Sequence, residues 1–97
     1  MNDCNAALRR SSKSSPLYAR ILDSRGLVRL RQGDYKDSIE DYDAALKMNP
    51  KGAWSLYGRG IAKLRKRMTA EGEADMAQAT ALSPRVAEEF ARRGINP

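Results

Sequence analysis

The feature of this sequence that most constrains its fold is an internal repeat with a period of 34 residues. A shift of that length brings Gly60 onto Gly26 and aligns residues 53–84 with residues 19–50. Nine aligned positions are then identical, whereas chance would give about two at average residue frequencies. A fixed period of this length is typical of a solenoid, in which each unit packs on its neighbours. We therefore interpret each copy as one structural unit.

Each unit is predicted to be a pair of helices. In the first copy, apolar residues recur at helical spacing from Ile21 to Leu30, and Gly33 is expected to end this helix. Asp34 is a favourable N-cap for a second helix, which should run to the Asn-Pro-Lys-Gly break at residues 49–52. No alternating run is long enough to indicate a β-strand. The expected fold class is therefore all-α, an α-solenoid of antiparallel helix pairs.

The second copy repeats this plan and is followed by one further helix. Thr69 is expected to cap the second helix of this copy, and Ser83 followed by Pro84 should open the final helix, which Gly94 ends. The predicted segments are a remnant helix with a Ser-rich linker (1–15), a first unit (16–50), a second unit (51–83), and a capping helix with a tail (84–97).

The N-terminal segment has a weaker relation to the repeat. Its residues 3–8, Asp-Cys-Asn-Ala-Ala-Leu, are similar to the Asp-Tyr-Asp-Ala-Ala-Leu of residues 41–46. This similarity suggests that they are the end of a helix from a preceding unit. The chain then derives from a longer array, or its first unit has decayed. The segment lacks the apolar stretch of a secretory signal, so we expect a cytoplasmic protein, with export of a longer precursor as the alternative.

Small residues recur at matching positions of the two copies. Gly26 and Gly60 stand in mid-helix, where glycine costs about 1 kcal/mol relative to alanine. Their repetition predicts that a neighbouring helix approaches too closely for a Cβ atom. The alternative is that glycine is merely tolerated at these positions after sequence drift. The matching small positions on the second helices are Ser38 with Gly72 and Ala45 with Ala79.

At these residues the chain resembles the tetratricopeptide repeat family. The family's small residue of the first helix matches Gly26 and Gly60, its Gly-Asp-Tyr between the helices matches residues 33–35, and its closing proline matches Pro50 and Pro84. The resemblance implies a non-catalytic module that binds other proteins.

The second copy departs from the family pattern at two positions. Arg67 stands where the turn glycine is expected, and Glu73 replaces an apolar residue. We therefore expect a different turn between the helices of the second unit.

Several classes of chemistry lack the residues they need. The chain has no histidine and a single cysteine, Cys4, so neither a Ser-His or Cys-His nucleophile nor a zinc site can be assembled. Gly58 and Gly60 lie within a helical pattern rather than in a phosphate-binding loop. The acidic residues of 37–43 spread around a helix, so they do not form a calcium loop. We therefore expect a protein that is not an enzyme, that binds no cofactor or metal, and that does not span a membrane.

Charge divides between the two kinds of helix. The first helices are basic and the second helices are acidic, within a net charge of +6. Ion pairs between them would explain part of this division without any ligand, and the repeated candidates are Arg25 with Asp41 and Arg59 with Asp75.

The resemblance also implies where a partner binds, because the first helices of such repeats line a concave groove. Positions matched one by one give the candidate peptide-binding residues Arg20, Asp23, Leu27, Arg31, Trp54, Tyr57, Ile61 and Arg65. Arginine and aromatic side chains supply most binding hot spots, so we expect a peptide or partner helix that is acidic and has apolar anchors. For Trp54 packing on Val86 and Phe90 is an equal alternative, whereas for Tyr57 the groove is favoured.

Two other functions stay open at this stage. Nucleic acid could bind the basic first helices through counterion release, but the acidic second helices dilute that patch and make this partner less favoured. A structural role through self-association is the third hypothesis, because two repeats bury little surface and three are usual for stability. A homo-oligomer would then be the functional form.

Overall fold

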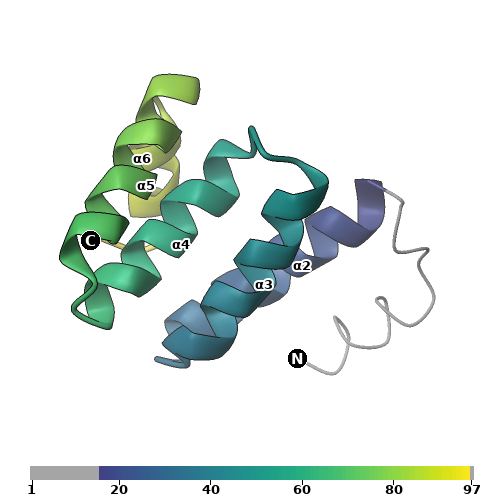
Figure 1. Ribbon diagram of the computed structural model, residues 1–97, viewed down its shortest axis with the longest axis horizontal. Helices are drawn as coiled ribbons and strands as arrows, with labels where there is room; N and C mark the ends of the chain where they lie inside the picture. Colours follow the sequence, from purple (N-terminus) through teal and green to yellow (C-terminus); the bar gives the residue numbers. More distant parts are fainter. Residues whose placement is uncertain (1–15, 97) are drawn as a thin grey trace.

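The computed structural model describes residues 16–96 of the 97-residue chain, and every regular element in that part is a helix (Figure 1). The remnant helix predicted within residues 1–15 lies outside the described part. The helices are α2 (Pro16–Arg31), α3 (Tyr35–Met48), α4 (Ala53–Arg65), α5 (Thr69–Leu82) and α6 (Val86–Arg92). The all-α prediction is confirmed.

The helices stack as two pairs with a short helix at the end. In Figure 1, α2 runs beside α3 and α4 beside α5, each pair antiparallel, while α6 passes behind α4 and α5. Contacts between α3 and α4 and between α2 and α4 join the two pairs, and α6 packs on both helices of the second pair. The first helices, α2 and α4, thus lie next to each other, as the helical-repeat prediction requires.

The turns that join the helices of each pair have the same geometry. Gly33 has φ +80°, and the N–H of the residue after it donates to the Arg29 carbonyl at 2.9 Å. Arg67 has φ +64°, and the corresponding bond reaches the Lys63 carbonyl at 2.8 Å. Both turns are Schellman motifs, which need a left-handed residue just after the helix. The expectation of a different second turn is wrong, because Arg67 adopts the conformation for which glycine is favoured.

The first helix begins at Pro16 as expected, whereas α5 and α6 begin one or two residues away from their predicted starts. Asp34 stands at the N-cap of α3, but its side chain makes no capping hydrogen bond. Thr69 is already the first residue of α5, and Met68 holds the N-cap. Ser83 is the C-cap of α5, and α6 begins at Val86 rather than at the proline. These errors of one or two residues arise because the pattern of apolar residues locates a helix but not its first turn.

The prediction of crowded glycines is confirmed. A Cβ atom on Gly60 would lie 2.6 Å from Met76 Cγ and 2.8 Å from the carbonyl oxygen of Gly72. In the first pair, the buried Ser38 hydroxyl donates to the carbonyl of Gly26 at 2.8 Å. In each pair, two small residues therefore face each other where the helices are in contact.

The contact between the two pairs depends on Tyr42, which the helical pattern of α3 places on its apolar face. The ring of Tyr42 is fully buried and lies against α2 and α4 at once. A Cβ atom on Gly58 would come within 2.4 Å of this ring, and one on Gly26 within 3.0 Å. Burial raises the pKa of the Tyr42 hydroxyl far above its usual value, which keeps the group neutral.

The ion pairs predicted from the repeat are present in both units. Arg25 Nη2 lies 2.7 Å from Asp41 Oδ1, and Arg59 Nε lies 2.8 Å from Asp75 Oδ2. Arg59 also reaches Asp43 of the preceding helix, with Nη1 2.9 Å from Oδ1. This last pair links the two units. In each unit, basic side chains of the first helix therefore help to hold the second helix in place.

Candidate protein-binding face

The candidate site is the face of the molecule formed by α2 and α4, which we call the α2/α4 face. It carries the eight side chains predicted to bind a partner, and the structure divides them into three groups. Exposed side chains are those of Arg20, Arg31 and Arg65, half-buried ones are those of Asp23, Leu27 and Trp54, and buried ones are those of Tyr57 and Ile61.

The half of the face that lies on α4 is covered by α6. Phe90 is fully buried, and its ring centroid lies 4.1 Å from that of Trp54 and 5.0 Å from that of Tyr57. For Trp54 the packing alternative is therefore correct. The expectation that Tyr57 and Ile61 face an open groove is wrong, because they are only 5% and 0% exposed. Burial also raises the pKa of the Tyr57 hydroxyl.

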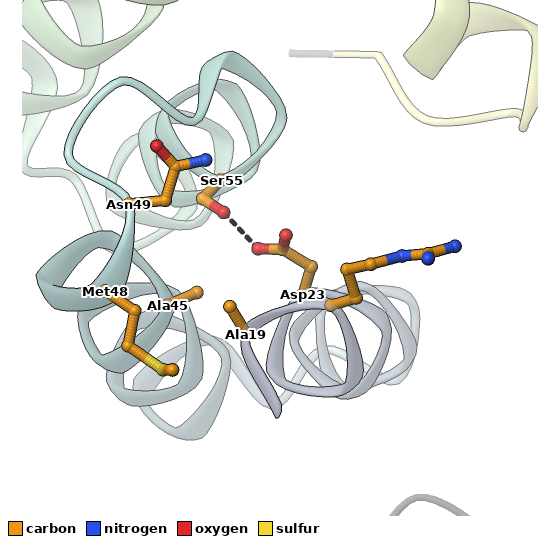
Figure 2. Close-up of a pocket in the computed structure, with 7 residues that line it drawn as sticks. Ala19, Asp23, Ala45, Met48, Asn49 and Ser55 are labelled. Atoms are coloured by element: carbon orange, nitrogen blue, oxygen red, sulfur yellow. Dashed lines mark hydrogen bonds between the residues drawn. The ribbon is translucent and has the colours of Figure 1, made fainter. Parts of the chain in front are cut away.

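The half of the face that lies on α2 contains a cavity of about 430 Å³ (Figure 2). It lies between the start of α2, the end of α3 and the start of α4. Figure 2 shows Asp23 and Ser55 pointing toward each other in its lining, where the buried Ser55 hydroxyl donates a hydrogen bond to the Asp23 carboxylate. The lining residues are Ala19, Arg20, Asp23, Ala45, Met48, Asn49 and Ser55.

Asp23 gives this cavity its chemical character. Burial raises the pKa of the Asp23 carboxyl above its ordinary value, and the hydrogen bond from Ser55 opposes that rise. Within residues 16–96, the carboxylate has no hydrogen-bond donor besides Ser55. Ala19, Ala45 and the Met48 side chain supply apolar wall. The cavity can therefore accept a side chain with an apolar stem and a hydrogen-bond donor at its tip.

Sequence reasoning found only part of this cavity. Arg20 and Asp23 were among the predicted residues, whereas Met48, Asn49 and Ser55 were not. Ala45 was noticed only as a small position for helix packing. No pattern in the sequence indicates Ser55, because its hydrogen bond to Asp23 spans 32 residues and depends on how the two pairs stack.

A second cavity of about 220 Å³ lies at the other end of the face, near the ends of α2 and α4. Two predicted partner-binding arginines border it, and both already donate to main-chain carbonyls of the chain itself. Arg31 Nη2 lies 2.7 Å from the carbonyl oxygen of Arg93, and Arg65 Nη2 lies 3.0 Å from that of Asn96. The segment after α6 therefore occupies this end of the face.

The part of the chain that the structure describes shows no group of three or more side chains arranged to hold a metal ion. None of its helices combines the length and the apolar character needed to cross a membrane.

Comparison with known proteins agrees with this geometry. The family model for the TPR repeat matches residues 26–66, which run from the middle of α2 through α3 to the end of α4. Comparison with curated proteins and with solved structures returned no match. The matched segment contains the small positions Gly26, Ser38, Ala45 and Gly60, the Gly-Asp-Tyr turn, the second half of α2 and all of α4. Residues 26–66 therefore match the tetratricopeptide repeat, in agreement with the paired helices of the described residues.

Proposed function

We propose that this protein binds a segment of a partner protein on the α2/α4 face, with one partner side chain in the cavity beside Asp23. Tetratricopeptide repeats generally mediate protein–protein interactions and are typically not catalytic. The observation that carries the proposal is the cavity itself. It is large enough to admit a large side chain, it opens on the face used by such repeats, and it combines apolar walls with a half-buried carboxylate.

The charges around the cavity define the partner's chemistry. The Asp23 carboxylate favours a hydrogen-bond donor at the tip of the inserted side chain, such as an amide or ammonium group. Exposed Arg20 stands at the same cavity and favours an acidic residue next to the inserted one. The partner segment is therefore a mixed one, with an apolar stem and donor at one position and an acidic flank.

The ion pairs argue against nucleic acid as the partner. Arg25 and Arg29 both lie within ion-pair distance of Asp41, and Arg59 and Lys63 both lie within that distance of Asp75. Each of these four basic side chains is therefore held against a carboxylate within the fold. A binding mode that depends on many free phosphate contacts loses much of its driving force on such a surface.

A library of octapeptides and a single-stranded oligonucleotide, titrated side by side at low and physiological salt, test the proposal. We expect peptides to be selected, with binding that weakens only moderately as salt screens the exposed arginines. Ala19→Leu should fill part of the cavity and weaken the selected peptides by about tenfold, the effect of losing one moderate hot spot.

The matched control is Ala81→Leu, which adds the same atoms at an exposed position of α5. It should leave peptide affinity unchanged. Tight oligonucleotide binding with a steep salt dependence, and no selected peptide, would support the nucleic-acid alternative instead. Native mass spectrometry of the same samples distinguishes a third outcome, in which the face binds a second copy of the chain.

A further inference from the structure

Residues 93–96 lie on the α2/α4 face in the manner of a bound peptide. Ile95 is only 8% exposed and belongs to the same buried cluster as Leu30 and Ile61. On either side of it, main-chain carbonyls accept hydrogen bonds from Arg31 and Arg65, as described above. One apolar anchor between two main-chain contacts is a common pattern in the recognition of a short peptide segment.

The backbone turn that brings Ile95 to this position is local. Gly94 has φ +77°, and the N–H of Ile95 donates to the Phe90 carbonyl at 3.0 Å, which closes a Schellman motif at the end of α6. Beside it, the Arg93 guanidinium lies 5.0 Å from the centre of the Trp54 ring. The segment is therefore directed back across α4 rather than away from it.

Closing this turn does not itself require a buried apolar residue. At the end of α2, the same motif places Asp34 at the position that corresponds to Ile95, and Asp34 is exposed. An apolar contact at this position often accompanies the motif but is not part of its hydrogen bonding. The burial of Ile95 therefore reflects what the α2/α4 face offers at this end, which is an apolar site between two arginines.

We propose that this end of the α2/α4 face is a subsite for one aliphatic side chain of a partner segment, and that residues 93–96 are its resident occupant. Arg31 and Arg65 hold the main chain on either side of the anchor. A partner that extends beyond the Asp23 cavity displaces the chain's own segment and places an isoleucine, leucine or valine where Ile95 now lies. This inference rests on the proposed function and adds a second anchor to it.

The test compares the full-length chain with its Ile95→Asp variant against the same octapeptide library. Because the apparent affinity of a site falls with the fraction of time that it is open, removing the occupant should strengthen peptides with an aliphatic anchor by about tenfold or more. Hydrogen exchange should also show faster exchange of the residue-95 amide in the variant, because the turn that holds this amide opens more often once the segment is no longer docked.

A second variant keeps the test decisive if Ile95→Asp loosens α6. Replacing both Arg31 and Arg65 by Gln leaves Gly94 and Ile95 unchanged, so α6 should stay folded. The segment loses its two docking hydrogen bonds, so the turn should open more often and the Ile95 amide should exchange faster. Arg85→Gln, at an exposed position before α6, is the control and should change neither readout.

Two outcomes would count against the proposals, and they are distinguishable. Equal affinity of wild type and Ile95→Asp for every selected peptide overturns the inference alone. Absence of peptide binding to both chains overturns the proposed function and, with it, the second anchor. Selection of aliphatic peptides that bind the variant about tenfold more tightly, together with faster exchange in the double arginine variant, supports it.

Discussion

Arg67 holds a left-handed backbone conformation, with φ +64°, at the position where the first unit has Gly33. Such a conformation costs a residue with a Cβ atom about 1–2 kcal/mol. We therefore expect Arg67→Gly to raise the free energy of unfolding by about 1 kcal/mol, after allowance for the greater freedom of glycine in the unfolded chain. Urea denaturation measures this change. Lys66→Gly, next to it at φ −90°, is the control and should lower stability instead.

Gly60 shows the opposite case, in which glycine is needed for space rather than for its backbone angles. Alanine normally stabilises a mid-helix position by about 1 kcal/mol relative to glycine. At Gly60 the new Cβ would lie 2.8 Å from the main-chain oxygen of Gly72, which cannot rotate away. We expect Gly60→Ala to cost about 1–3 kcal/mol, as overpacking does.

Gly26→Ala provides the comparison for Gly60→Ala. The nearest atoms there belong to the Tyr42 ring, at 3.0–3.2 Å, so a smaller loss is expected. Thermal unfolding of both variants measures the difference. A higher melting temperature for Gly60→Ala would show that α4 and α5 can separate at no cost, and would contradict the packing described here.

Between helices, the carboxyl groups of Asp75 and Asp23 should give opposite pH dependences. Burial alone would raise the pKa of Asp75, but hydrogen bonds from Arg59 and Lys63 outweigh it and hold this pKa below the ordinary 3.8. Its ionised form therefore stabilises the fold above pH 3.8, and this contribution is lost as the pH falls through the lowered pKa. Asp75→Asn should be less stable than wild type at pH 7, with the difference shrinking at pH values below 3.8.

Asp23 should give the opposite pH dependence of stability. Burial raises its pKa above 3.8, and the hydrogen bond from Ser55 only partly offsets this rise. The fold then favours the protonated form. That contribution is fully present below pH 3.8 and is lost as the pH rises through the raised pKa. Asp23→Asn should therefore match or exceed wild-type stability at pH 7, and any advantage should disappear at low pH.

Urea unfolding of wild type and the two variants at pH 7 and at pH 3 tests both expectations. The same sign of pH dependence in the two variants would contradict the difference in their environments. Asp23→Asn should also weaken the selected peptides despite its stability. Such a variant separates the binding role of the carboxylate from its effect on the fold.

For the whole molecule, the docking of α6 on α4 decides how much of the α2/α4 face is open. Phe90 is fully buried and joins α6 to Trp54 and Tyr57. Phe90→Ala should cost about 3–5 kcal/mol, the range for removing a buried aromatic ring. Because Trp54 is the only tryptophan, its fluorescence should shift to longer wavelength as water reaches the ring.

Glu89→Ala is the matched control on the same helix, since Glu89 is exposed. It should change neither the stability nor the emission of Trp54. If Phe90→Ala leaves both unchanged as well, α6 does not pack on α4 in solution, and the face is open along its whole length.

The sequence by itself determined the contacts that recur with the 34-residue period. Arg25 with Asp41 and Arg59 with Asp75 have the same separation in both copies, so two independent instances supported each inference. The crowding at Gly26 and Gly60 could be predicted for the same reason. Such contacts lie within one helix pair, where helical geometry alone fixes which positions face each other.

Only the tertiary structure decided which part of the α2/α4 face is open. Tyr57 and Ile61 stand at positions that match Asp23 and Leu27, yet they are buried because α6 and residues 93–96 fold back over α4. This docking occurs once, at the end of the repeats, so no second copy in the sequence indicates it. The Asp23 cavity likewise depends on how two pairs stack around Tyr42, which is set by side-chain volumes far apart in the sequence rather than by any periodic pattern.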